Sequence, residues 1–319
     1  MTTGRSAILH LGTYKTGSSS LQNLLYANRD LLAEQGVLYP QAGVIRDEVI
    51  GYRHRRLIMP FMKGETDTYV VKSLRKELGK QRQQRVVISN ESWSSPRHLP
   101  MLGGFCGELE DLGFEQMTGV VFLRRLVDYK VSHYREFTLR QGNKLGYERY
   151  LLGTPGVFDY LFLVRNFRSI FGDDLRLIDY ARTEDTVSCF FETTGLSALL
   201  PELTPVGKAN VKPVGALGVE VMRHANRQGL ERAEGLAFLS WFTERRADLF
   251  TEEWTERESP ETLRYGSRYR KDLAQLLDWS PEAVEALLED RPIIGRPVGR
   301  AQKEIAAGFK EWGQLRRAS

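Results

Sequence analysis

The fold that we expect for this chain follows from one stretch, Ile8-Leu-His-Leu-Gly-Thr-Tyr-Lys-Thr-Gly-Ser-Ser-Ser-Leu-Gln22. It begins with a short apolar run, which is typical of a strand buried on both faces of a sheet. A turn of small and hydroxyl-bearing residues follows. After the turn, mainly apolar residues recur at helical spacing, and Gly36 is expected to end the helix. The residues at that spacing are Leu21, Leu24, Leu25, Asn28 and Leu32. The sequence therefore predicts a strand, a tight turn and a helix.

The turn from Gly12 to Ser19 has the composition of an anion-binding site. Free N–H groups at the start of a helix lie at the positive end of its dipole, and glycine lets the backbone approach a phosphate closely. The residue order differs from the NTP-binding loop G-x-x-x-x-G-K-[ST], because Lys15 precedes Gly17. The alternative interpretation is an ordinary turn in which Ser18 caps the helix.

A carboxylate follows the second predicted strand, Val86-Val-Ile-Ser89. This strand continues directly into Asn90 and Glu91. In an open parallel sheet, ligands bind beyond the carboxyl ends of the strands, so Glu91 is expected at the same edge as Lys15. An acidic residue that pairs with backbone donors at a helix N-terminus would occupy the same place.

An arginine pair follows the third predicted strand, Gly119-Val-Val-Phe-Leu123. Arg124 and Arg125 come at its end, before a helical stretch, and Ser132 follows Arg124 by eight residues. The alternative interpretation of Arg124 is a residue of a surface ion pair.

Together these motifs resemble those of sulfotransferases that use 3′-phosphoadenosine-5′-phosphosulfate (PAPS). The run Lys15-Thr-Gly-Ser-Ser19 resembles the family's 5′-phosphosulfate loop, and Arg124 with Ser132 resembles its 3′-phosphate motif. The resemblance covers about residues 5 to 200 and is to bacterial-type, carbohydrate-class members. One departure is Leu126, where the family usually has proline two positions after the arginine.

The resemblance implies a P-loop-like three-layer α/β/α fold with a parallel sheet of at least four strands. We expect the fourth strand at Leu175–Ala181. Residues 1–200 would form the PAPS-binding core, and residues 201–319, in which we predict no strand, would form a helical C-terminal extension. That extension is expected to pack on the core and cover the acceptor cleft.

The resemblance also implies roles for individual residues. Lys15, Thr16, Gly17, Ser18 and Ser19 would bind the 5′-phosphosulfate, with Lys15 also acting in catalysis, and Arg124 and Ser132 would bind the 3′-phosphate. Some carbohydrate members use a glutamate as general base and others a histidine, so Glu91 is the first candidate and His54 the second. The five histidines lack metal-binding spacing, and we expect no catalytic metal.

The composition limits the kinds of ligand and the compartment that we expect for this protein. The 319 residues carry 45 Lys and Arg against 41 Asp and Glu, a net charge of +4 that favours anionic ligands without indicating nucleic acid. With no signal-peptide pattern, no long apolar run and only two cysteines, we expect a cytoplasmic protein without a transmembrane segment. Peripheral membrane contact and the oligomeric state stay open.

The predicted function is sulfuryl transfer from PAPS to a hydroxyl of a carbohydrate or glycolipid, giving PAP and a sulfate ester. Two alternatives remain. A P-loop-type small-molecule kinase would need Mg²⁺ and normally an aspartate at a strand end, and a non-catalytic nucleotide- or glycan-binding protein would keep the loops without turnover.

Overall fold

The computed structural model describes residues 4–45, 51–65, 67–80, 84–207, 214–256, 265–289 and 296–318. The chain forms two compact units, and each is discontinuous in sequence. The first comprises Met1–Arg125, Gly156–Ala209 and Ser267–Leu287, and the second comprises Leu126–Pro155, Asn210–Gly266 and Leu288–Ser319. The expected core of residues 1–200, its helical extension and the cover over an acceptor cleft stay predictions.

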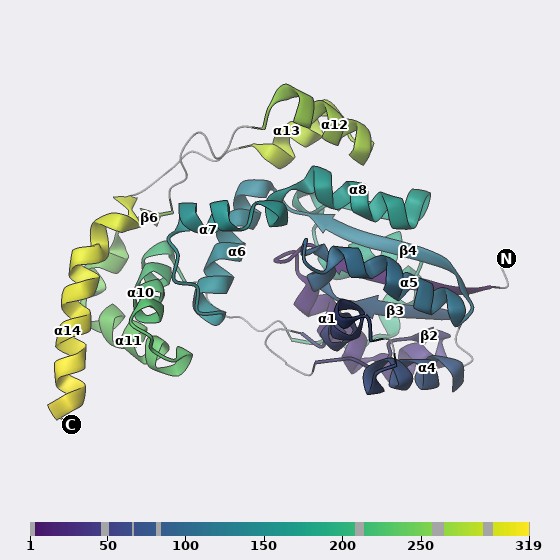
Figure 1. Ribbon diagram of the computed structural model, residues 1–319, viewed down its shortest axis with the longest axis horizontal. Helices are drawn as coiled ribbons and strands as arrows, with labels where there is room; N and C mark the ends of the chain where they lie inside the picture. Colours follow the sequence, from purple (N-terminus) through teal and green to yellow (C-terminus); the bar gives the residue numbers. More distant parts are fainter. Residues whose placement is uncertain are drawn as a thin grey trace. The chain divides into compact units, whose positions relative to one another are not determined.

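The first unit contains a parallel sheet that confirms the predicted α/β class (Figure 1). In the described part of the chain this sheet has five strands in the order β2-β3-β1-β4-β5. All neighbouring strands run parallel. The strands are β1 Arg5–Gly12, β2 Val37–Leu38, β3 Arg85–Ser89, β4 Phe114–Leu123 and β5 Leu175–Asp179. The edge strand β2 was not predicted, because two residues are too few to show a period.

Helices cover both faces of this sheet, which gives the three-layer arrangement. Ile8, Val87 and Phe122 share one face and pack in a core cluster with residues of α1, α2 and α9. On the opposite face, Gly119 of β4 lies so close to Phe171 of α8 that an added Cβ would meet its ring at 2.8 Å. The helices of this unit are α1 Ser18–Ala27, α2 Arg29–Glu34, α3 Ile58–Lys63, α4 Tyr69–Lys80, α5 Leu102–Asp111, α8 Tyr160–Phe171, α9 Thr186–Thr193, α12 Ser267–Leu277 and α13 Pro281–Leu288, the last residue of α13 lying at the unit's boundary.

The first predicted helix is interrupted at Asn28, where the structure separates α1 from α2. The Asn28 side chain donates to Leu24 O at 2.9 Å and to Thr204 O at 3.0 Å, and it accepts from Thr204 N–H at 2.8 Å. An asparagine amide that pairs with backbone competes with helix continuation. The apolar spacing continues across the break, and so the sequence pattern did not reveal it.

The second unit is mainly helical and has its own core. Residues of three helices form this core, for example Val221, Phe238 and Ile305. Its helices are α6 Leu126–Arg140, α7 Tyr147–Gly153, α10 Ala216–Arg227, α11 Arg232–Arg245 and α14 Gln302–Ala318. Two short strands that were not expected, β6 Trp254–Thr255 and β7 Arg296–Pro297, pair in parallel. Among the described residues, no helix combines the length and apolar character that crossing a membrane requires.

Candidate functional site

The loop between β1 and α1 presents an uncapped helix start. Gly17 is the N-cap residue of α1, adopts φ 80° and provides no side-chain cap, and the first helical turn contains no acid. Ser18 is therefore the first helical residue, and the alternative of a turn capped by Ser18 does not describe this loop. An added Cβ on Gly17 would lie 2.4 Å from Thr186 Oγ1, so both backbone conformation and space favour glycine.

Ser18 gives this helix start a buried polar atom that lacks a protein partner. The residue is 7% exposed, and its Oγ makes no hydrogen bond within the described structure. Buried polar atoms are usually paired, and the exceptions need an explanation. A hydroxyl at the positive end of α1 is suited to donating to an anion.

Internal hydrogen bonds fix the conformation of the loop. Thr13 donates to Phe122 O from both its N–H and its Oγ1, each at 3.0 Å, which ties the loop to the end of β4. Thr16 Oγ1 donates to Thr13 O at 2.7 Å, and Thr186 Oγ1 donates to Thr16 O at 2.9 Å. The Thr16 hydroxyl thus closes the loop, while Lys15, in a left-handed conformation with φ 67°, is exposed.

Arg124 lies against this loop. Its Nη1 donates to Lys15 O at 2.8 Å, and its guanidinium carbon lies 5.7 Å from the centre of the Tyr180 ring. Tyr160 OH donates to Arg124 O at 2.6 Å, which holds the backbone just beyond β4. The structure therefore brings together two predicted site residues, Arg124 and Lys15. Ser132 lies on α6 in the second unit, and its pairing with Arg124 stays a prediction.

Glu91 follows β3 at the edge where the loop begins. An added Cβ on Gly12, at the end of β1, would lie 3.1 Å from the Glu91 backbone, so the two chain segments touch. Glu91 begins the short 3₁₀-helix η2 Glu91–Ser94, and it is the side chain of Asn90 that accepts from Ser92 N–H and caps this turn. The alternative role of Glu91 as a capping acid is thereby taken by Asn90.

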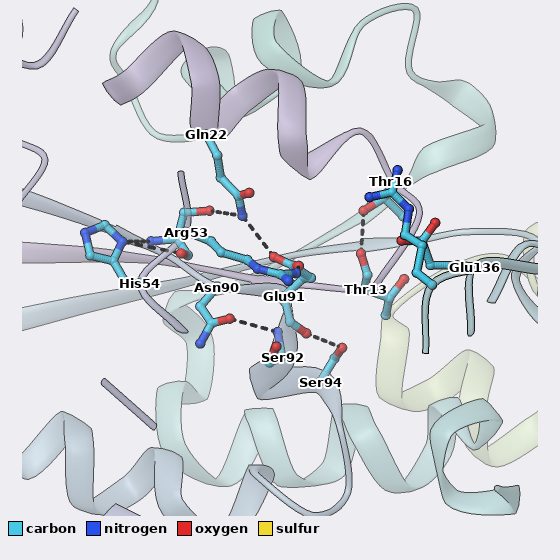
Figure 2. A network of polar contacts seen from close by, with 12 residues as sticks. Thr13, Thr16, Gln22, Arg53, His54, Asn90, Glu91, Ser92, Ser94 and Glu136 are labelled. Carbon is cyan, nitrogen blue, oxygen red and sulfur yellow. Dashed lines mark hydrogen bonds and ion pairs between the residues drawn. The ribbon is translucent and has the colours of Figure 1, made fainter. Parts of the chain in front are cut away.

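Two side chains from distant segments hold the Glu91 carboxylate (Figure 2). Gln22 reaches down from α1, and its Nε2 donates to Glu91 Oε2 at 2.9 Å. Arg53 Nη1 donates to Glu91 Oε1 in an ion pair whose side chains are only 10% and 7% exposed. Each carboxylate oxygen has further lone pairs, so these two bonds orient the group without using its full accepting capacity.

Ser89, the last residue of β3, connects this cluster to the interior of the sheet. Its Oγ accepts from Gln22 Nε2 at 3.1 Å and lies 2.8 Å from His10 Nδ1. His10 is fully buried on β1, and burial lowers its pKa to about 4, an effect that the nearby negative charge of Glu91 partly opposes. At neutral pH His10 is therefore an uncharged part of the network.

His54, the second candidate base, is fully buried and makes hydrogen bonds through both ring nitrogens. Ser89 N–H donates to Nδ1 at 3.1 Å, so the proton is on Nε2, which donates to Pro40 O at 2.8 Å. Burial lowers the pKa of His54 to about 4, and the contacts of its ring with the carbonyl oxygens of Pro40 and Ser89 oppose this effect. With both nitrogens paired to backbone, His54 has no free position from which to take a proton in this structure.

Tyr14 lies beside Glu91 and was not identified from the sequence. Burial raises the pKa of its phenol to about 12, and the negative charge of Glu91 acts in the same direction. A hydrogen bond with Ser92 and the positive charges of Arg53 and Arg55 oppose this rise. The phenol therefore stays protonated and able to donate near the carboxylate.

The chain is similar to a sulfotransferase. A crystal structure titled as a sulfotransferase from Alicyclobacillus acidocaldarius matches it with a TM-score of 0.45 at 14% sequence identity, covering 88% of this chain and 99% of that one. No protein-family model and no curated protein sequence matches the chain.

Three members of the cluster are not among the site residues predicted from local patterns: Gln22, Arg53 and Tyr14. Gln22 had a usable signal, because it lies one helical turn after Ser18 and so on the same face of α1. Arg53 had none, because it comes from an irregular segment whose position depends on tertiary contacts. Within the described residues, no group of histidine, cysteine, aspartate and glutamate is arranged to hold a metal ion.

Proposed function

We propose that this protein is a PAPS-dependent sulfotransferase that moves a sulfuryl group to an acceptor hydroxyl and releases PAP. The observation that supports this best is the uncapped N-terminus of α1, with the buried and unpartnered Ser18 hydroxyl, adjacent to the strand end that carries Glu91. We propose a carbohydrate or glycolipid as acceptor, on the sequence resemblance.

The loop fits the 5′ end of such a nucleotide. Ser18 Oγ lacks a partner within the described structure, and no acid in the first turn of α1 repels an anion. Backbone N–H groups of Thr16 to Ser19 would hold the 5′-phosphate, and Arg124 with Ser132 would hold the 3′-phosphate. PAPS supplies the activated sulfuryl group.

In the proposed step, the acceptor oxygen forms a bond to sulfur while the bond from sulfur to the phosphate oxygen breaks. The leaving phosphate oxygen keeps the electron pair, and the exposed ammonium of Lys15 stabilises the charge that develops there. Glu91 takes the proton of the acceptor hydroxyl, which makes that oxygen a better nucleophile. We assign the base to Glu91 rather than His54, because both nitrogens of His54 are paired with backbone.

The test compares Glu91→Gln with Glu108→Gln. Both glutamates are buried and paired with an arginine, but Glu108 pairs with Arg75 on α4, away from the loop. Glu91→Gln should leave PAP affinity, measured by calorimetry, nearly unchanged and lower the rate of PAP release by roughly 10²- to 10⁴-fold. Glu108→Gln should affect stability and leave the rate within about twofold, since it touches no part of the site.

Three results would contradict the proposal. A folded Glu91→Gln variant that binds PAP and turns over within a fewfold of the parent places the base elsewhere. Conversion of ATP with Mg²⁺ to ADP in the presence of an acceptor would favour a kinase. Tight binding of PAP or a glycan without turnover across a panel of sugars, lipids and water would indicate a binding protein.

A further inference from the structure

A buried arginine accompanies the proposed base, and the residue after it binds the same strand end. Arg53 is 9% exposed and pairs with Glu91 through Nη1 alone. Burying an ion pair costs desolvation free energy that the attraction often fails to repay, so such a pair is weak evidence for a role in stability. Its position on the proposed base calls for a functional explanation.

His54 fixes the backbone next to Arg53 by a reciprocal pair of hydrogen bonds with Ser89. His54 N–H donates to Ser89 O at 2.9 Å, and Ser89 N–H donates to His54 Nδ1 at 3.1 Å. On the other side of the ring, Nε2 donates to Pro40 O at 2.8 Å. Because Ser89 lies two residues before Glu91, His54 attaches Arg53 to the same strand end that carries the carboxylate.

Further bonds hold the segment around Arg53 in place. Ile45 N–H donates to Arg53 O at 2.9 Å within an antiparallel bridge, and Tyr39 OH donates to Tyr52 O at 2.7 Å. The Tyr39 ring packs edge-on against His54, with ring centres 4.6 Å apart. A long, flexible arginine side chain loses less freedom on pairing when its backbone is already fixed.

We propose that Arg53 is a positioning residue that fixes the Glu91 carboxylate for proton transfer, and that His54 anchors Arg53 to the end of β3. This inference rests on the proposed function and adds to it a role for two residues of a segment outside the phosphate-binding loop. Arg53 holds Oε1 and Gln22 holds Oε2, so the carboxylate has one orientation toward the acceptor. Displacing a catalytic group by about 1 Å can cost roughly 10²-fold in rate.

The test measures kcat, KM and PAP affinity for Arg53→Gln, Arg53→Lys and the control Arg56→Gln. Arg56 is three residues after Arg53 and exposed, and we give it no role in the site. Arg53→Gln should lower kcat by roughly 10²-fold while changing KM and PAP affinity less than about threefold. Arg53→Lys should regain at least about a tenth of the parent rate, because the observed contact uses a single nitrogen that an ammonium can replace.

A double variant separates positioning from an independent effect. If Arg53 acts through Glu91, Arg53→Gln should cost no further rate in the Glu91→Gln background, as expected for residues that act as a unit. Additive losses would overturn the inference. If Arg53→Gln alone does not fold, Arg53→Lys and the double variant, which leaves no unpaired buried charge, still decide the question.

Failure of this inference and failure of the proposed function give different results. A parent protein that does not bind PAP overturns both the proposed function and the positioning role of Arg53. A parent that binds PAP and turns over, with Arg53→Gln matching Arg56→Gln within about twofold, overturns the positioning role alone. A parent that binds PAP but transfers sulfuryl to no sugar, lipid or water removes the base assignment and the positioning role, and leaves the nucleotide site.

Discussion

Acid should destabilise this protein through two buried histidines of the candidate site. His10 and His54 are fully buried, and burial lowers each pKa from 6.5 to about 4. Protons therefore bind more tightly to the unfolded chain than to the folded one. As pH falls below about 6.5, the unfolded state takes up protons that the folded state refuses, and stability is lost until about pH 4.

The size of this effect follows from the shift. A pKa shift of one unit corresponds to about 1.4 kcal/mol, so each histidine contributes up to about 3 kcal/mol to the free energy of unfolding across the window from about pH 6.5 to about pH 4. Between about pH 7 and pH 5 the linkage relation gives about 2 kcal/mol per histidine, or about 4 kcal/mol for both. This is a large fraction of the roughly 5 to 15 kcal/mol that stabilises a typical protein.

The assay is urea unfolding between about pH 7.5 and pH 5, followed by circular dichroism, for the parent and His54→Asn. The asparagine keeps an acceptor for Ser89 N–H and does not titrate, so the variant should lose the share of the pH slope that His54 contributes, about half of the share of His10 and His54 together. The control is His224→Asn on α10, a half-buried histidine outside the site whose pKa burial also lowers, so it should reduce the slope by less than His54→Asn does. A His54→Asn slope equal to that of the parent would refute the reasoning, as would an equal reduction by His224→Asn.

Three further outcomes concern the loop. Lys15→Ala should lower kcat more than it weakens PAP binding, since its ammonium acts on charge that develops in the transition state; loss of PAP affinity with kcat unchanged at saturation would make it a phosphate anchor only. Gly17→Ala should lower the thermal stability of the protein more than Gly36→Ala. Both glycines have φ near 80°, where alanine costs about 1 kcal/mol or more, but only at Gly17 would the added Cβ meet Thr186. Equal losses of stability would contradict this contact. Calorimetry should show that PAP binds more tightly than AMP, and that Arg124→Ala removes this preference; a preference that survives would place the 3′-phosphate elsewhere.

The sequence predicts the central strands because each is a short apolar run that ends in polar residues. Four predicted strands correspond to β1, β3, β4 and β5, and their polar ends meet at one sheet edge, as parallel topology requires. The prediction that Glu91 arrives at the same sheet edge as the loop carrying Lys15 followed from the same rule, and the Glu91 backbone lies against Gly12 at the start of that loop. Local pattern and sheet topology were sufficient for this part of the site.

The rest of the site depends on contacts that no local pattern contains. Arg53 pairs with Glu91 from a segment whose next residue, His54, binds Ser89, a contact between residues 35 positions apart. The sequence indicated His54 as a candidate base because its residue type fits that role, whereas its burial and its two backbone-paired nitrogens support the anchoring role that we propose. The discontinuity of the two units had no sequence signal either, because it arises from contacts between segments that are far apart in the chain.

Ser89 shows why the candidate site lies where it does. As the last residue of β3 it is aligned with His10 of β1, its backbone N–H and C=O pair with His54, and its hydroxyl meets His10 and Gln22. Three segments that are distant in sequence thus converge on one residue, and Glu91 follows two positions later on the same strand end. A carboxylate directly after β3 is held in place by the sheet, whereas one further along the loop would be held less firmly. That fixed position is what a general base requires, since proton transfer needs its oxygen within hydrogen-bonding distance of the acceptor.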